Sequence, residues 1–173
     1  MILEEGQPTE DIHFISKGIC QVSKNIKFVL AAGINNNYKY RQFTSESDLK
    51  PREQIVMKTL QIATLRQFDF FGEEDLLTLG RRQALSESFN SNTSKTTWTI
   101  RAEGKVECLT IAKIDFFRAL TLAECDDISK HYARYPPLEK IVSTFLINSE
   151  WARYKEEVMN EIYARKRIAQ TTK

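Results

Sequence analysis

The chain has 173 residues, of which 42% are hydrophobic and 28% charged, and its formal net charge is +2. This length suits one domain, or one domain with a helical extension, and is sufficient for a hydrophobic core. The small net charge gives no sign of a nucleic-acid or membrane partner, and no apolar run approaches the roughly 20 residues of a membrane span. Because no secretory signal opens the chain, we expect a cytoplasmic protein. Met1 is followed at once by the strand-like Ile2 and Leu3, so we expect the chain to begin inside an element of a longer protein.

The cysteines and histidines are too few and too far apart to predict a metal site. Cys20, Cys108 and Cys125 are odd in number and form no C-x-x-C pair, which favours a reducing compartment and structural thiols. His13 and His131 lack the neighbours that a metal cluster or a His-based triad needs. Since the sequence offers no nucleophile–base pair either, we expect a protein that is not an enzyme and has no metal or cofactor.

The first part of the chain has the pattern of short antiparallel strands. Apolar residues alternate partly near Ile12 and Phe14 and again over 19–22, and turn signals lie at Gly6 and Gly18. Residues 24–58 contain an Asn triplet and a polar stretch, and we interpret them as a long, partly mobile insertion between two strands. The strand pattern returns over 56–65.

The stretch 67–83, QFDFFGEEDLLTLGRRQ, predicts a strand end, a turn at Gly72, one short helical turn and a basic loop. A glycine turn that leads into a helix N-terminus presents unpaired backbone N–H groups. With a guanidinium close by, such a turn can bind a phosphate group. Residues 84–96 are rich in Ser, Asn and Thr and predict a loop.

The remaining chain predicts a hairpin and then helices. Apolar and polar residues alternate over 97–102 and 106–111, on either side of a glycine turn, which predicts a hairpin. Many short strands followed by helices predict an α+β protein that is mainly β, an antiparallel β-roll or jelly-roll-like barrel with C-terminal helices. Helical spacing begins at Lys113 after the weak N-cap Ala112, and Pro136-Pro137 starts the next helix. Asn148-Ser149 predicts a break. Apolar residues recur at helical spacing on both sides of it: Leu138, Ile141, Val142 and Phe145 before it, and Trp151, Tyr154, Val158 and Ile162 after it. The second stripe predicts an amphipathic helix that needs a protein partner.

The motif FGEEDLL followed by GRR resembles the phosphate-binding cassette of cyclic-nucleotide-binding domains, a family that includes the catabolite activator and the regulatory subunits of protein kinase A. The resemblance implies that Gly72 lets the backbone approach the ribose-phosphate and that Glu73 accepts a hydrogen bond from the ribose 2′-OH. It also implies that the amides through Glu74 and Asp75 face the cyclic phosphate, and that Arg82 pairs with that phosphate.

The flanking segments also resemble this family. ILEEGQPTEDIHFISKGICQVSK is similar to its first hairpins, and TWTIRAEGKVECLTIAKIDFFRAL to its closing strands and the helix after them. The resemblance implies a β-roll domain over 1–122, with insertions near 24–58 and 84–96, and lid or extension helices over 123–173. It further implies a regulatory sensor of cyclic AMP or cyclic GMP in a larger signalling protein, with Phe145, Trp151 or Tyr154 stacking on the base.

A second interpretation keeps the β-roll but not the ligand, as a protein-interaction scaffold. Asp75 stands where the family has a small residue, Arg81 replaces its usual proline, and the segment SESFNSNTSK lengthens the cassette loop. A cupin-type enzyme would need clustered histidines, and a transcription regulator would need a helix-turn-helix after the last helix. The early insertion and the tail WARYKEEVMNEI resemble segments of ciliary proteins, which suggests association with the cilium.

Overall fold

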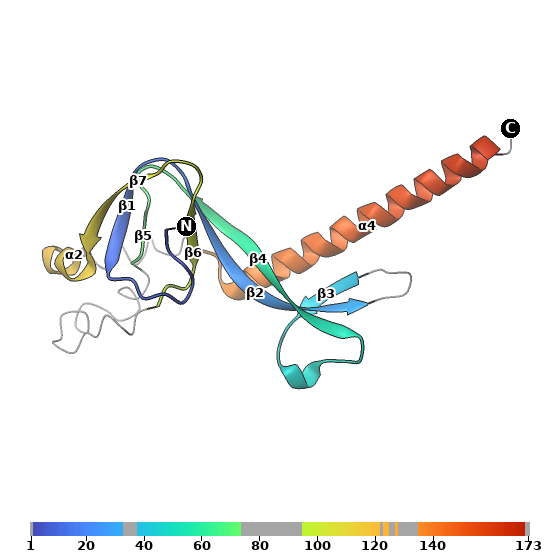
Figure 1. Cartoon of the computed structure of the whole chain (residues 1–173), viewed down its shortest axis with the longest axis horizontal. Coiled ribbons are helices and arrows are strands. Elements are labelled where there is room, and N and C mark those ends of the chain that lie inside the picture. Colours follow the sequence, from blue (N-terminus) through green and yellow to red (C-terminus); the bar gives the residue numbers. More distant parts are fainter. Residues whose placement is uncertain are drawn as a thin grey trace. The chain divides into compact units, whose positions relative to one another are not determined.

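The computed structural model describes residues 2–32, 38–73, 95–121, 123–124, 127 and 135–171. Over these residues the protein is α+β, with antiparallel sheets and a long C-terminal helix (Figure 1). The chain divides into two compact units, one formed by Met1–Asn25 and Thr59–Pro136 and the other by Ile26–Lys58 and Pro137–Lys173. No described helix is long and apolar enough to span a membrane.

The first unit contains a three-stranded sheet with β1 (Asp11–Lys17) at its centre. β1 pairs antiparallel with β5 (Phe70–Phe71) on one side and with β7 (Glu107–Ala112) on the other. Ile12 and Ile15 are both fully buried although they are three residues apart. Because successive strand side chains point to opposite faces, β1 is covered on both of its faces.

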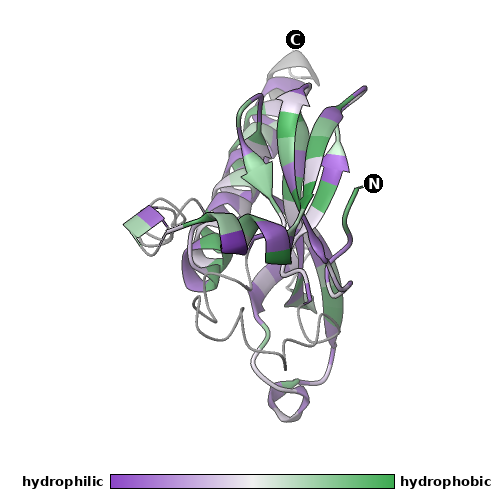
Figure 2. Cartoon of the chain, turned by 90° about the vertical axis from the view of Figure 1, so that its left-hand side faces the viewer, coloured by the Kyte–Doolittle hydropathy of each residue, from purple (hydrophilic) through white to green (hydrophobic). Residues whose placement is uncertain are grey.

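A second sheet has the strand order β3-β2-β4, and β6 (Thr99–Ala102) also pairs with β2. The unit boundary falls inside the two long strands, β2 (Cys20–Ala32) and β4 (Glu53–Leu65). The part of β2 in the first unit, over residues 20–23, runs antiparallel to β6. Figure 2 shows apolar and polar residues alternating along the strands, as strands with one buried face require. The first unit's core consists of Ile15, Cys20, Val22, Leu65, Phe71 and Ile100.

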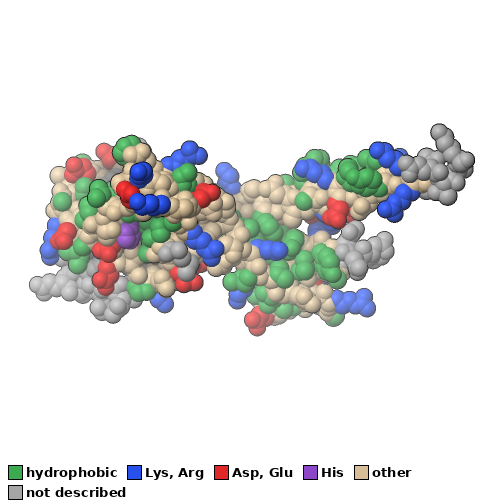
Figure 3. Space-filling model, turned by 45° about the horizontal axis from the view of Figure 1, so that its top comes forward, with side chains coloured by type: hydrophobic (Ala, Val, Ile, Leu, Met, Phe, Trp, Pro, Cys, Tyr) green, Lys and Arg blue, Asp and Glu red, His purple; other side chains and the backbone are tan. Residues whose placement is uncertain are grey.

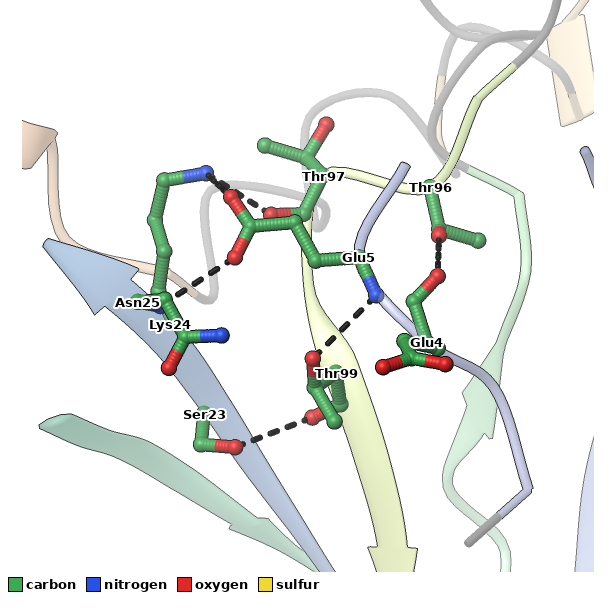
Figure 4. Close-up of polar contacts among 8 residues, drawn as sticks. All are labelled: Glu4, Glu5, Ser23, Lys24, Asn25, Thr96, Thr97 and Thr99. Carbon is green, nitrogen blue, oxygen red and sulfur yellow. Dashed lines mark hydrogen bonds and ion pairs between the residues drawn. The ribbon is translucent and has the colours of Figure 1, made fainter. Parts of the chain in front are cut away.

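Polar contacts fix the N-terminal segment to this core (Figure 4). The Glu5 carboxylate accepts hydrogen bonds from the Lys24 ammonium at 2.9 Å and from the Asn25 backbone N–H at 3.1 Å, and the Glu5 N–H donates to the Thr99 hydroxyl at 3.1 Å. Ile2 N–H donates to the carbonyl of Ile100 at 2.9 Å. The segment before β1 is therefore bound to both β2 and β6.

The second unit packs one helix against a hairpin. β3 (Tyr38–Gln42) pairs antiparallel with residues 28–32 of β2, and α4 (Leu138–Thr171) contributes Phe145. The ring of Phe145 lies 4.4 Å from that of Phe28 and 5.3 Å from that of Tyr40, measured between centroids. The other buried apolar residues of this unit are Ile26, Val29, Ile141 and Val142. A short 3-10 helix, η2 (Glu46–Asp48), lies between β3 and β4.

The predicted strands around 12–14, 97–102 and 106–111 are confirmed as β1, β6 and β7, and a turn in which Gly104 has φ +81° joins the last two. The predicted hairpin is wrong, because β6 pairs with β2 and β7 pairs with β1 in the other sheet. The predicted helix start at Lys113 is also confirmed as α2 (Lys113–Ala119). As expected, Ala112 provides no side-chain cap. Pro137 opens α4, because its carbonyl accepts hydrogen bonds from the N–H groups of Lys140 and Ile141.

The interpretation of 24–58 as a long connection between two strands is wrong for residues 24–32, 38–42 and 53–58, which are themselves strands. That the segment is an insertion stays a prediction. β2 continues to Ala32, β3 returns beside it, and β4 already begins at Glu53. The connection between β3 and β4 is held by Arg41, whose guanidinium lies 2.6 Å from the Glu53 carboxylate and donates to the Asp48 carbonyl at 2.8 Å. Strand pairing and these polar contacts order a segment whose composition alone suggests a loop.

The predicted break at Asn148-Ser149 is also wrong, because α4 runs through it without interruption. The Ser149 hydroxyl donates to the carbonyl of Leu146 at 2.8 Å, so this polar side chain is satisfied within the helix. The predicted domain boundary at 122 stays a prediction; the compact units group residues 26–58 with residues 137–173. Among the described residues the strands form two open sheets and no closed barrel.

Candidate functional site

The turn at Gly72 has a geometry that only glycine can adopt without strain. Gly72 follows β5 directly and has φ +99°. A Cβ atom at this position would lie 2.5 Å from the carbonyl oxygen of Asp11. Glycine is therefore required twice, for the left-handed backbone and for the close approach to β1.

The chain before this turn is anchored to β1. The Phe68 N–H donates to the Ile15 carbonyl at 2.9 Å, and the Ile15 N–H donates to the Asp69 carbonyl at 2.8 Å. Phe71 is buried in the core, and its ring stacks on His13 with centroids 4.9 Å apart. The backbone thus enters the Gly72 turn from a defined position.

Glu73 follows the turn, and only 3% of its surface is exposed. Burying a carboxylate costs several kcal/mol unless charged or hydrogen-bonding partners surround it. In an ordinary surface turn, a glutamate side chain remains exposed to solvent, so the burial of Glu73 is unusual. Of the predicted site residues, the structure describes Gly72 and Glu73, which are neighbours in the sequence. The other three, Glu74, Asp75 and Arg82, lie outside the described residues, as does most of the predicted loop 84–96.

A second buried charged residue in this unit, Lys113, was not predicted. Lys113 opens α2, is 2% exposed, and its backbone N–H donates to the Glu10 carbonyl at 2.9 Å. Burial lowers the pKa of His13; the nearby Asp11 carboxylate raises that pKa, and the Lys113 ammonium lowers it. The His13 Nδ1 lies 3.1 Å from the Thr110 hydroxyl. A lysine at a helix start is usually solvated, so no local pattern in the sequence marks this one as buried.

The described cysteines behave as structural thiols. Burial, reinforced by Cys108, raises the pKa of Cys20 to about 11, and burial also raises the pKa of Cys108. Thiols with raised pKa are poor nucleophiles and poor metal ligands. Among the residues that the structure describes, no group of His, Cys, Asp or Glu is arranged to hold a metal ion.

The three residues predicted to stack on a base lie on different faces of α4. Phe145 packs in the core of the second unit against Phe28 and Tyr40. Trp151 and Tyr154 are 56% and 53% exposed and stack on each other, with centroids 5.4 Å apart. A role in covering a base stays a prediction for all three.

A shallow hollow in the second unit lies between β3 and α4. It encloses about 40 Å³ and is lined by Tyr38, Lys39, Tyr40, Ser149, Glu150 and Arg153. This volume holds about one water molecule and is far too small for a nucleotide.

No protein-family model matches this chain, and no curated protein matches it significantly.

Proposed function

We propose that the first unit is a regulatory domain that binds a cyclic nucleotide, cyclic AMP or cyclic GMP, and that it senses this ligand without catalysis. The observation that carries the proposal is the Gly72–Glu73 pair: a glycine with φ +99° packed on β1, followed at once by a buried carboxylate. The finer part of the proposal is that the antiparallel strands around this turn belong to the β-roll of the cyclic-nucleotide-binding family.

The chemistry of such a ligand fits the residues of the stretch 72–82. A cyclic nucleotide carries one phosphate charge and a free ribose 2′-OH. In the proposed site Glu73 accepts a hydrogen bond from that hydroxyl, and the withdrawal of Glu73 from water strengthens the bond. Backbone N–H groups after Gly72 and the guanidinium of Arg82 bind the phosphate, each charged hydrogen bond contributing about 1.5–3 kcal/mol.

Calorimetry with cyclic AMP and cyclic GMP tests this proposal. We expect micromolar binding of at least one nucleotide, and a loss of at least tenfold in affinity for Arg82→Ala. Arg81→Ala is the matched control, because it removes the same side chain one position away and should leave the affinity within about twofold. Glu73→Gln should weaken the binding of the cyclic ribonucleotide and have much less effect on the binding of its 2′-deoxy analogue. The absence of heat with either nucleotide, or equal losses for Arg81→Ala and Arg82→Ala, would overturn the proposal.

Asp75 allows a further check of the same site. An aspartate beside the phosphate repels it, so Asp75→Ala should tighten nucleotide binding several-fold if the amides around it face the ligand. Unchanged or weaker binding would show that the phosphate lies elsewhere.

The second candidate function is an interaction module without ligand. The observation that favours it is the set of large apolar side chains exposed along α4, including Ile147, Trp151 and Tyr154. The two functions are not exclusive, because the first belongs to the first unit and these side chains to the second.

A further inference from the structure

Among the described residues of the second unit, α4 carries an apolar stripe whose larger side chains are exposed to solvent. The stripe consists of Ile147, Trp151, Tyr154, Val158 and Ile162. At 3.6 residues per turn these positions fall within an arc of about 80°. The two rings of the stripe, Trp151 and Tyr154, keep about half of their surface exposed. Figure 3 shows apolar side chains exposed along this helix, with acidic and basic side chains beside them.

The stripe is not part of the second unit's own core. The residues of α4 that pack on β2 and β3 are centred on Ile141, Val142 and Phe145. At 100° per residue, the centre of this inner face lies about 150° around the helix from the centre of the stripe. A helix with two opposite apolar faces is one that packs on both sides.

The charges on the two flanks of the stripe are segregated by sign, and Arg165 lies in line with the stripe itself. The acidic residues Glu150, Glu157 and Glu161 lie along one flank, and the basic residues Lys155 and Lys166 lie along the other, according to the same helical geometry. When two copies of a helix pair in parallel, opposite flanks meet; when they pair antiparallel, equal flanks meet. Only the parallel arrangement places acidic residues against basic ones.

The spacing supports a specific contact in such a pair. From Ile147 to Val158 the apolar positions alternate by four and three residues, which is the heptad spacing of a two-stranded coiled coil. In that register Glu150 takes a g position and Lys155 the e position five residues later, the pair that joins two parallel helices. The step of four to Ile162 makes an eleven-residue spacing, which lets the two helices run nearly straight.

We propose that α4 pairs in parallel with α4 of a second copy of this chain through this stripe. Aromatic side chains bury about 150–250 Å² each, and about half of that area is still exposed on Trp151 and Tyr154. With the aliphatic residues, two copies would bury on the order of 1,000 Å² in total, the lower end of specific interfaces. The result is a reversible dimer whose population depends on concentration.

The ion pairs that the flanking residues already form within the chain are weak enough to be replaced by ion pairs in a dimer. Glu150 lies 3.1 Å from Lys39, and Glu157 lies 3.7 Å from Arg153. In each pair both side chains remain at least one-third exposed to solvent. Exposed pairs of this kind contribute little to stability, so new partners in a dimer can replace them.

Sedimentation velocity of the full chain over a hundredfold range of concentration tests the dimer. We expect the weight-average mass to rise towards twice that of the chain, and Trp151→Ser/Tyr154→Ser to shift the dissociation constant upward by at least tenfold. Met159→Ser/Tyr163→Ser is the matched control, because these side chains are 45% and 54% exposed on the same helix but lie off the stripe. Circular dichroism establishes that each variant keeps its helix.

Charge reversal tests the parallel direction. Glu150→Lys alone and Lys155→Glu alone should each weaken the dimer several-fold, and the double swap Glu150→Lys/Lys155→Glu should restore it. Restoration requires that position 150 of one copy meets position 155 of the other. A chain that stays monomeric at all concentrations, an equal effect of the control variant, or a double swap without restoration would overturn the proposal. Because none of these measurements uses a nucleotide, their failure is distinct from failure of the sensor.

Discussion

The close approach of Gly72 to β1 gives the sharpest prediction for the first unit. In Gly72→Ala the new Cβ would lie 2.5 Å from the Asp11 carbonyl oxygen, and the backbone would keep φ +99°. The left-handed conformation costs a non-glycine residue about 1–2 kcal/mol. Displacing a neighbouring backbone atom costs about a further 1–3 kcal/mol. We therefore expect a loss of about 2–5 kcal/mol in the free energy of unfolding.

Gly104→Ala separates these two contributions. Gly104 has φ +81°, but nothing lies within 4 Å of its added Cβ, so only the conformational cost applies. Urea denaturation followed by tryptophan fluorescence measures both variants. With a slope of about 2 kcal/mol per M, the Gly72→Ala midpoint should fall by about 1–2.5 M. Gly18→Ala, whose Cβ would lie 2.6 Å from the Lys105 carbonyl oxygen, should resemble Gly72→Ala. Equal losses for Gly72→Ala and Gly104→Ala would refute the argument from close approach.

Two further predictions concern the second unit. The Arg41 guanidinium holds the pKa of the Glu53 carboxyl at about 2. The ion pair therefore stabilises the fold fully above the unfolded pKa near 4.5, and this stabilisation is lost as the pH falls towards 2. Thermal unfolding between pH 6 and pH 2 should show this loss in the native chain and much less of it in Glu53→Gln. Phe145→Ala should lower the free energy of unfolding by about 3 kcal/mol because it empties the space beside Phe28, whereas Trp151→Ala in dilute solution should change it by less than about 1 kcal/mol. Comparable losses for the two substitutions in urea denaturation would contradict the assignment of Phe145 and Trp151 to opposite faces.

Much of the local structure follows from local patterns. The alternation over 106–111 predicts β7, the change of period at Lys113 predicts α2, and Pro137 predicts the start of α4. Each of these signals depends on residues within about one turn or one strand of each other. The turn at Gly72 is predicted for the same reason, since a glycine after two strand aromatics has few other roles.

The candidate site was predictable only in part. The motif drew attention to Gly72 and Glu73, and the structure adds that the turn packs on Asp11 and that the acid is buried. It also adds the burial of Lys113, which no local pattern indicated. Burial depends on what other segments place around a side chain, and a single stretch of sequence carries no direct record of that.

The sequence by itself determined the periods of the elements, the positions of the tight turns and the apolar stripes of the last helix. Tertiary structure decided that residues 26–32, 38–42 and 53–58 are strands rather than a loop, because backbone pairing and the Arg41–Glu53 contact supply an order that their composition does not encode. It also decided which stripe of α4 is core and which is exposed. Both stripes recur at helical spacing, and the packing of Phe28 and Tyr40 against Phe145 marks the first of them as core.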